Sequence, residues 1–243
     1  KSSSVDDLNR IAFIKNAQVS WKTGKLTLHG GLITTTQFKV QEDFWGYRYM
    51  MMSFQDYYKW GSSADLGISA SYQLADWISA DAIVVNGEGY KKVQKTDGLQ
   101  YGLGVTLRPV SGLTVRLYGS LNEGADPTKE DITNLATMVG YKGKSFSIAG
   151  EYNLMANSGN VKDANLYGIS VYGTVKVNKQ VETFLRYDQL SSKDDWNENK
   201  DESSILAGAQ FKVGKYVKLA PNFRMFMPKK EGADNRYMAY ISC

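Results

Sequence analysis

The sequence lacks the features of a helical membrane anchor. No run of roughly 18 or more apolar residues occurs in its 243 residues, and the mean hydropathy is −0.38. A transmembrane helix needs about 20 predominantly apolar residues, so a helical span is excluded. The first residues, Lys1 to Ser4, lack the apolar core of a signal peptide, which we expect has been removed or was not supplied.

The sequence also contains few cysteines, histidines and prolines, and its net charge is small. The single cysteine, Cys243, cannot form an internal disulfide, so cysteine usage says little about the compartment. The net charge is only +4, with acids and bases interspersed, and no basic stripe argues for a nucleic-acid partner. Four prolines stand against 23 glycines and 16 tyrosines, a composition typical of many strands and tight turns.

What the sequence does contain is alternation of apolar and polar residues with period two, which predicts strands. Between Gln100 and Arg108, for example, Tyr101, Leu103 and Val105 alternate with glycine, threonine and charged residues. About 13 such segments occur, each of roughly 8–12 residues, the length of a membrane strand. They are expected at 14–21, 26–33, 64–73, 77–85, 99–108, 113–121, 132–141, 145–154, 164–176, 181–190, 203–212, 216–227 and 235–243.

The two faces of these segments favour a membrane barrel over a soluble sandwich or barrel. The polar face carries Arg, Asp, Glu, Lys or Gly in nearly every segment, without an obvious partner sheet. The apolar face is never interrupted by a charge, and a charge facing lipid would cost about 2–4 kcal/mol at mid-bilayer. We therefore predict an all-β fold, a single transmembrane antiparallel up-and-down β-barrel domain over residues 1–243.

The connections between segments alternate between short and long. The short ones lie at 22–25, 74–76, 109–112, 142–144, 177–180 and 213–215, and the long ones at 34–63, 86–98, 122–131, 155–163, 191–202 and 228–234. Bacterial outer-membrane barrels have short periplasmic turns and long extracellular loops. The sequence therefore predicts a Gram-negative outer-membrane location and an orientation.

The parity of the segments predicts a further strand. The first segment, 14–21, and the last, 235–243, would both run towards the periplasm, so pairing them would require a parallel ladder. Bacterial barrels have even, antiparallel strand numbers. We expect at least one N-terminal strand to precede Lys1, giving about 14 strands, or about 16 if three are missing. Alternatively, residues 1–12 fold back as that strand.

One long connection, 34–63, breaks the alternation. Within 37–60, Val40, Phe44, Tyr47, Met51, Phe54 and Tyr58 recur at helical spacing, although Gly46 weakens the pattern. A loop of about 30 residues inside a domain is often functional. It either braces the lumen wall or forms a pore constriction, for which the candidate residues are Phe44, Trp45, Tyr47, Arg48, Tyr49 and Lys59.

The polar faces of the segments supply the candidate lumen lining, in which bases outnumber acids. These residues either pair across strands and stiffen the wall or give a weak anion preference. The candidates are Asp65, Asp81, Arg108, Arg116, Glu151, Glu182, Arg186, Asp188, Lys212, Lys218, Arg224 and Arg236.

Few features of the sequence support a catalytic site or a metal site. His29, the only histidine, lies on a polar face with no local Ser-His-acid motif around it, so we expect no enzyme activity. The spacing of Asp195, Asn197, Asn199 and Asp201 is similar to a calcium loop, but Lys200 stands where glycine is needed. Asn86-Gly87-Glu88-Gly89 is better interpreted as a turn than as a dinucleotide site. We expect no cofactor and no metal.

Several segments resemble the N-terminal part of phosphate-selective porin O/P-type proteins. They are 13–21, 26–33, the aromatic loop and 62–69, with Asn86 to Tyr90 after the fourth strand segment. The resemblance implies a passive diffusion channel with an inward loop and basic lumen residues. The sequence departs from that family in lacking an evident arginine and lysine ladder and a terminal phenylalanine.

Two functions remain open from the sequence. The first is a porin-like channel for passive diffusion of small hydrophilic solutes, with a weak anion preference. The second is a plugged structural or accessory barrel within a larger secretion or uptake complex. In both cases the expected surroundings are outer-membrane lipid and lipopolysaccharide, with homo-oligomers or membrane-protein partners as further candidates.

Overall fold

The computed structural model describes residues 14–92, 94 and 97–243, and the N-terminal stretch considered as a missing strand lies outside these residues. Thirteen antiparallel strands form one sheet in sequence order. Their bounds are β1 (Ala17–Thr23), β2 (Leu26–Thr34), β3 (Ala64–Ala75), β4 (Ile78–Val85), β5 (Gln100–Leu107), β6 (Leu113–Asn122), β7 (Ile132–Lys142), β8 (Phe146–Ala156), β9 (Leu166–Lys176), β10 (Val181–Ser192), β11 (Glu202–Val213), β12 (Val217–Pro228) and β13 (Arg236–Ser242). The predicted up-and-down β-architecture is therefore confirmed.

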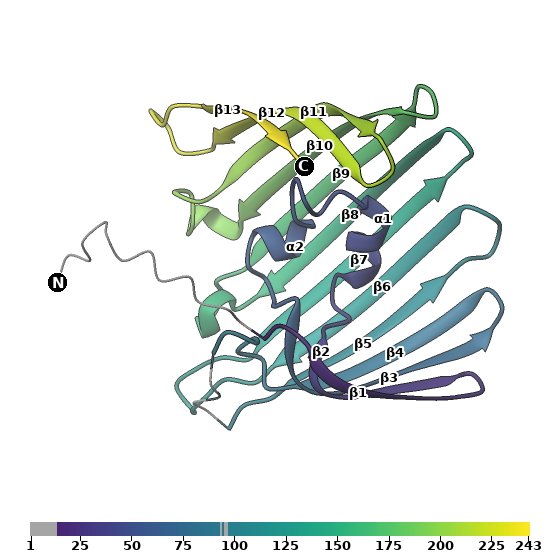
Figure 1. Ribbon diagram of the computed structural model, residues 1–243. Coiled ribbons are helices and arrows are strands. Elements are labelled where there is room, and N and C mark those ends of the chain that lie inside the picture. Colours follow the sequence, from purple (N-terminus) through teal and green to yellow (C-terminus); the bar gives the residue numbers. More distant parts are fainter. Residues whose placement is uncertain (1–13, 93, 95–96) are drawn as a thin grey trace, which may run out of the picture.

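The sheet curls around a central space, with short turns at one end and long connections at the other (Figure 1). We call these the short-turn end and the long-loop end. Two one-turn 3-10 helices, Ser158–Asn160 and Lys193–Asp195, lie in long connections. The strict alternation of connection lengths thus follows the sequence prediction.

The first and last strands are both edges of the sheet. β1 pairs only with β2 and β13 only with β12 among the described residues, and both run towards the short-turn end. A direct β1–β13 pairing would therefore be parallel.

The outward face of the wall is apolar and exposed. Ile68, Leu103 and Leu185 are 63%, 68% and 58% exposed, the reverse of what a water-soluble sheet does with such residues. Trp21, Trp77 and further exposed aromatics lie near the strand ends, as in the aromatic girdles of membrane barrels. The outward surface is therefore suited to lipid.

The core lies inside the barrel, between the wall and residues 35–63, which we call the lumen segment. This segment contains α1 (Lys39–Trp45) and α2 (Phe54–Tyr57), and both helices lie within the curve of the sheet (Figure 1). Neither these helices nor any other in the described ranges have the length and apolar character needed to span a bilayer.

Candidate functional site: the lumen and its inward segment

The lumen segment forms two short helices, α1 and α2, whereas the helical spacing in the sequence extended over all of 37–60. Gly46 ends α1 in a left-handed conformation with φ 73°, and its N–H donates to the carbonyl of Glu42. A glycine adopts this conformation without the steric cost that other residues meet. The break turns the chain back towards the long-loop end, so the predicted periodicity is confirmed only within each piece.

Three of the predicted constriction residues pack against the wall. Phe44, Trp45 and Tyr47 are 7%, 2% and 6% exposed. The ring of Trp45 lies 5.1 Å from that of Tyr172 on β9, and the ring of Tyr47 lies 5.1 Å from that of Phe184 on β10. These distances are typical of attractive aromatic pairs. The structure thus places these three rings in an apolar core on one side of the lumen.

Glycines on the inward face of the wall make room for two phenylalanines of the lumen segment. A Cβ atom added to Gly140 on β7 would collide with the ring of Phe44. A Cβ atom added to Gly168 on β9 would collide with the ring of Phe54, which is fully buried. The wall and the lumen segment are therefore fitted to each other at two separate levels.

Arginines from three wall strands donate to main-chain carbonyls of the lumen segment. Arg116 on β6 reaches the carbonyl of Thr36 at 3.0 Å. Arg186 on β10 reaches that of Met52 at 2.8 Å, and Arg224 on β12 reaches that of Met50 at 2.7 Å. Charged donors form stronger hydrogen bonds than neutral ones. The segment is thus held from several directions around the wall.

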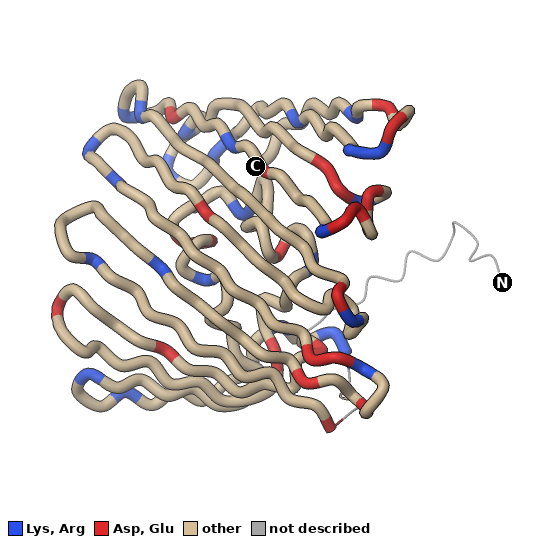
Figure 2. Tube along the Cα trace, turned by 180° about the vertical axis from the view of Figure 1, so that it is seen from behind, with Lys and Arg blue, Asp and Glu red and all other residues tan. Residues whose placement is uncertain are grey.

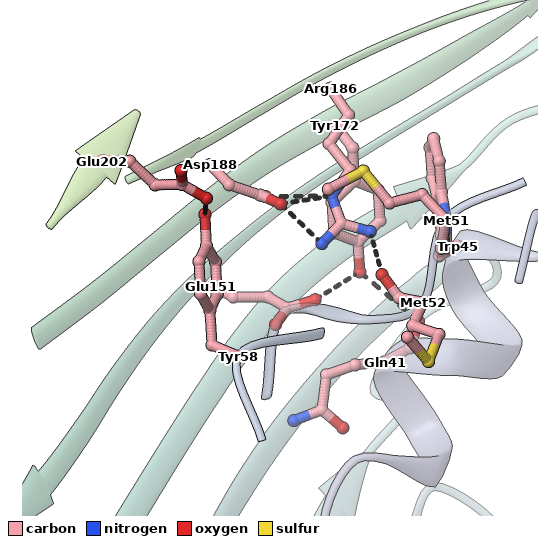
Figure 3. A network of polar contacts seen from close by, with 10 residues as sticks. All are labelled: Gln41, Trp45, Met51, Met52, Tyr58, Glu151, Tyr172, Arg186, Asp188 and Glu202. Carbon is pink, nitrogen blue, oxygen red and sulfur yellow. Dashed lines mark hydrogen bonds and ion pairs between the residues drawn. The ribbon is translucent and has the colours of Figure 1, made fainter. Parts of the chain in front are cut away.

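Arg186 lies in a buried polar network that connects three wall strands with the lumen segment (Figure 3). Its guanidinium contacts the carboxylate of Asp188 at 2.8–3.0 Å, and both side chains are almost fully buried. Its charge also lies 5.3 Å from the Trp45 ring, within cation–π range. Beside it, the hydroxyl of Tyr172 donates to Glu151 at 2.8 Å.

Amide side chains add a second buried connection nearer the long-loop end. Gln37 donates to the side-chain oxygen of Gln55 at 2.8 Å, and Gln55 donates to Asn153 on β8 at 3.0 Å. Gln100 on β5 donates back to Gln37 at 3.3 Å. Sequence analysis did not select these amides. A signal was available for Asn153 and Gln100, which lie on the polar faces of their strands, but not for Gln37 and Gln55.

Five of the twelve predicted lumen charges form ion pairs within the protein, namely Asp81, Arg116, Arg186, Asp188 and Arg236. Arg116, which is fully buried, forms an ion pair with Asp81. Arg236 contacts Glu202 at 2.6 Å, close to the hydroxyl of Tyr58. These residues do point inward as the alternation predicts, but their charges are neutralised by neighbours.

Asp65 has a structural role that explains the Asn86-Gly87-Glu88-Gly89 turn. One carboxylate oxygen accepts the N–H groups of Gly87 at 2.8 Å and Gly89 at 3.1 Å. Both glycines have positive φ, so their amides can converge on one acceptor. Asp65 is 3% exposed and closes the connection between β4 and β5.

The remaining predicted constriction residues lie where the lumen segment meets open space. Arg48 bridges Glu42 at 2.6 Å and Asp56 at 2.7 Å. Burial raises the pKa of Glu42 above its usual value, and the Arg48 charge opposes this rise. The hydroxyl of Tyr49 donates to Gln210 on β11 at 2.9 Å, while Lys59 lines the cavity at the long-loop end.

Two cavities lie on opposite sides of the lumen segment. The larger, about 570 Å³, is at the long-loop end and is lined by Arg48, Lys59 and Trp60 among others. The other, about 290 Å³, is at the short-turn end, between Phe44, Trp45 and Tyr47 and the ends of β7 to β12. Lys218 and Glu182 line this second cavity, whereas Arg108 lies in a surface depression beside the turn after β5.

Two acids of the candidate loop at 195–201 are engaged in contacts within the protein. Asp195 pairs with Lys229, and Asp201 accepts the N–H of Ser192 at 2.8 Å and its hydroxyl at 2.6 Å. Within the described ranges, no group of three or more His, Cys, Asp or Glu side chains is placed to hold a metal ion. His29 faces the lumen, with Ser20 Oγ 2.7 Å from its Nδ1 and Gln18 Nε2 3.3 Å from the same atom.

No protein-family profile matches the chain, and no curated protein is similar to it in sequence. Solved structures do share its fold. OmpT of Vibrio cholerae superposes with a TM-score of 0.64 at 18% identity, over 88% of this chain and 70% of OmpT. OccAB4 of Acinetobacter baumannii superposes with a TM-score of 0.58 at 12% identity, over 92% of this chain and 62% of OccAB4.

A refined structure described as a porin is also similar, with a TM-score of 0.58 at 11% identity, over 92% of this chain and 79% of that porin. The chain is therefore shorter than these proteins and spans about three fifths of the length of OccAB4. At such low identity the likeness concerns the fold, which is that of outer-membrane porin β-barrels.

Proposed function

We propose that this barrel is an outer-membrane channel for the passive diffusion of small hydrophilic solutes. The observation that carries the proposal is the combination of an apolar, lipid-suited outer wall with a polar lumen that a folded-in segment narrows. Inward loops that narrow a polar lumen set the size and charge of what can pass. The fold shared with porins supports the same function.

Planar bilayer recording tests this proposal on the full chain. The purified, refolded barrel should give discrete single-channel steps in KCl. A variant in which a short Gly-Ser linker replaces residues 37–60 should give larger steps, because the lumen segment occupies part of the cross-section. Folded barrels that insert into the bilayer yet carry no current would overturn the proposal.

The structure also bears on the alternative, a plugged accessory barrel. The segment is hydrogen-bonded to β5, β6, β8, β10, β11 and β12, which is the arrangement expected of a plug as well as of a constriction. A silent full-length barrel whose linker variant conducts would support this second function. Discrete steps from both proteins would contradict it.

We also propose a weak anion preference, which we assign to lysines at the short-turn end and not to the paired arginines of the lumen. Arg116, Arg186 and Arg236 are paired with acids, so these three arginines contribute little free charge. Lys212 and Lys218, exposed at the short-turn end, are better placed to attract anions. Under a KCl gradient, the reversal potential should indicate that chloride is the more permeant ion, and a cation-selective reversal potential would contradict this part.

We further propose that the gap between β1 and β13 is closed by an odd number of strands from the same protein. Both edges run in the same direction, so only an odd number completes an antiparallel ladder. The intact mass of the protein extracted from its native membrane tests this. A mass equal to that of these 243 residues would contradict it unless residues 1–12 supply the strand.

The membrane surroundings of the barrel, its partners and its relationship to a particular porin family are also proposals. Outer-membrane phospholipid and lipopolysaccharide would cover the apolar wall, small solutes would pass the lumen, and homo-oligomers or other membrane proteins would be the protein partners. A relationship to phosphate-selective porin O/P proteins rests on the sequence segments 13–21, 26–33 and 62–69. The proposed role is transport and not catalysis.

A further inference from the structure

A group of lysines lines the inward face of the wall at the short-turn end. Lys142 ends β7, Lys176 ends β9, Lys212 lies near the end of β11, and Lys218 is the second residue of β12. Two cavities lie at this end. The one of about 290 Å³ is lined by Lys142, Lys176 and Lys218, and the one of about 270 Å³ by Lys176 and Lys212, and the acid Glu182 lines both. We call these four residues the lysine mouth.

The charge of the lysine mouth is not neutralised by ion pairing. In the part of the chain that the structure describes, none of its four side chains forms an ion pair. Lys212 and Lys218 are direct cross-strand partners and both point inward. Such a like-charge pair is destabilising unless mobile anions screen it.

The long-loop end has a different charge pattern. Figure 2 shows mainly basic residues along the short turns, with an acid, Asp76, in the turn between β3 and β4, whereas acids and bases are mixed among the long loops. The cavity at that end is lined by bases and acids together, among them Lys59, Lys92, Asp56 and Glu88. Arg48, which also lines it, is bound by Glu42 and Asp56. The fixed charge therefore differs between the two ends, with lysines and one acid lining the cavities at the short-turn end and bases mixed with acids at the long-loop end.

We propose that the lysine mouth acts as an anion-collecting entrance that makes the channel conduct unequally in the two directions. This inference rests on the proposed channel function and adds a residue-level cause of selectivity. A fixed charge in a narrow entrance raises the local concentration of counter-ions and can do so by several kT of potential. At the long-loop end, the described residues that line the cavity mix bases with acids, which weakens such an effect.

The direction of the asymmetry follows from ion transport at the edge of a charged zone. Anions carry most of the current within the lysine mouth, and both ions carry it in the mixed region beyond. When the long-loop side is positive, anions move from the lysine mouth into the mixed region faster than they leave that region for the bulk solution. Salt then accumulates and the current rises, while the opposite polarity depletes salt and lowers the current.

Current–voltage curves of single channels in symmetric KCl test the proposal. At 0.1 M, the current should be larger by a factor of about 1.5 or more when the long-loop side is positive, because a Debye length of about 10 Å lets the field of the lysines reach into the entrance. At 1 M, where that length falls to about 3 Å, the asymmetry should vanish. The exposed Cys243, at the short-turn end, allows a membrane-impermeant thiol reagent to identify the orientation.

Matched variants separate charge from shape. K176Q/K212Q/K218Q should conduct with a nearly symmetric curve, whereas K176R/K212R/K218R keeps the charge and should keep the asymmetry. K144Q/K215Q, in the turns outside the strands, should leave most of it intact. If the triple glutamine variant folds poorly, K212Q/K218Q should still reduce the asymmetry.

The outcomes distinguish the inference from the function on which it rests. A conducting wild-type channel with a symmetric curve at 0.1 M, or with the opposite sign, overturns the lysine-mouth inference and leaves the channel function standing. The same holds if the triple glutamine variant folds, conducts and keeps the full asymmetry. A folded, inserted barrel without current overturns the channel function itself.

Discussion

At the scale of single residues, charge inside this barrel is stabilised by close partners. Arg186 is surrounded by Asp188, the carbonyl of Met52 and the Trp45 ring, and it is 1% exposed. A buried ion pair contributes little net stability compared with apolar residues, but removing one member leaves an unpaired buried charge. The network therefore matters most when it is broken.

Substituting Arg186 tests this. R186M should lower the free energy of unfolding by about 3–5 kcal/mol, because Asp188 is left buried without its partner. R108M, at an exposed position beside a short turn, is the control and should stay within about 0.5 kcal/mol of wild type. Urea titration in lipid vesicles measures both, and equal stability of the two variants would argue against the network.

A second residue-scale prediction concerns Glu42. Burial raises its pKa in the folded barrel relative to the unfolded chain, so its contribution to stability is fully present at low pH and is lost as pH rises through the raised pKa. E42Q should therefore show a flatter loss of stability between the ordinary carboxyl range and neutral pH. Unfolding midpoints measured across that range check this, and parallel curves for the two proteins would contradict it.

At the scale of elements, the lumen segment is positioned by the space that the wall leaves for it. Gly140 and Gly168 leave hollows on the inward face, which Phe44 and Phe54 fill. A one-atom change at either position is felt, because packed interiors do not tolerate extra volume. The position of the lumen segment therefore depends on the lack of side chains at these two glycines as well as on the phenylalanine rings that fill the space.

Gly168 provides the test of this fit. G168V should displace Phe54 and lower the free energy of unfolding by about 1–3 kcal/mol, the usual cost of overpacking. G150V is the matched control, since nothing lies within 4 Å of a Cβ atom at Gly150 on the outward face of β8. Single-channel conductance should change for G168V alone. The same behaviour in both variants would rule out the fit between Gly168 and Phe54.

At the scale of the whole molecule, the wall is built for lipid on one side and for polar groups on the other. Leu103 lies in the middle of β5, points outward and is 68% exposed. In a bilayer such a position faces hydrocarbon, where an arginine costs about 2–4 kcal/mol, whereas at the membrane interface the cost falls to about 0–1 kcal/mol. Depth in the membrane should therefore decide the effect of a charge.

L103R and V110R compare the two depths. Val110 lies in a short turn and is 60% exposed, so V110R should cost about 1 kcal/mol or less, against about 2–4 kcal/mol for L103R. Folding free energies in phospholipid vesicles measure the difference. Similar costs at both positions would mean that the outward face of β5 does not contact hydrocarbon.

The sequence by itself determined the wall of this protein. Period-two alternation placed all 13 strands to within a few residues, and connection lengths predicted which end carries the short turns. Both are local properties, since the side-chain direction in a strand follows from its pleat. The inward direction of Arg116 and Lys218 followed in the same way.

Only the tertiary structure decided what fills the lumen. Whether Arg186 faces solute or holds Met52 depends on a segment more than a hundred positions away, and no local pattern encodes that distance. Likewise Phe44 and Tyr47 proved to be packed against β9 and β10, while Lys176 and Lys212 came to share an entrance. Local periodicity determines which way a side chain points, and the curvature of the sheet together with the inward path of residues 35–63 determines what it contacts.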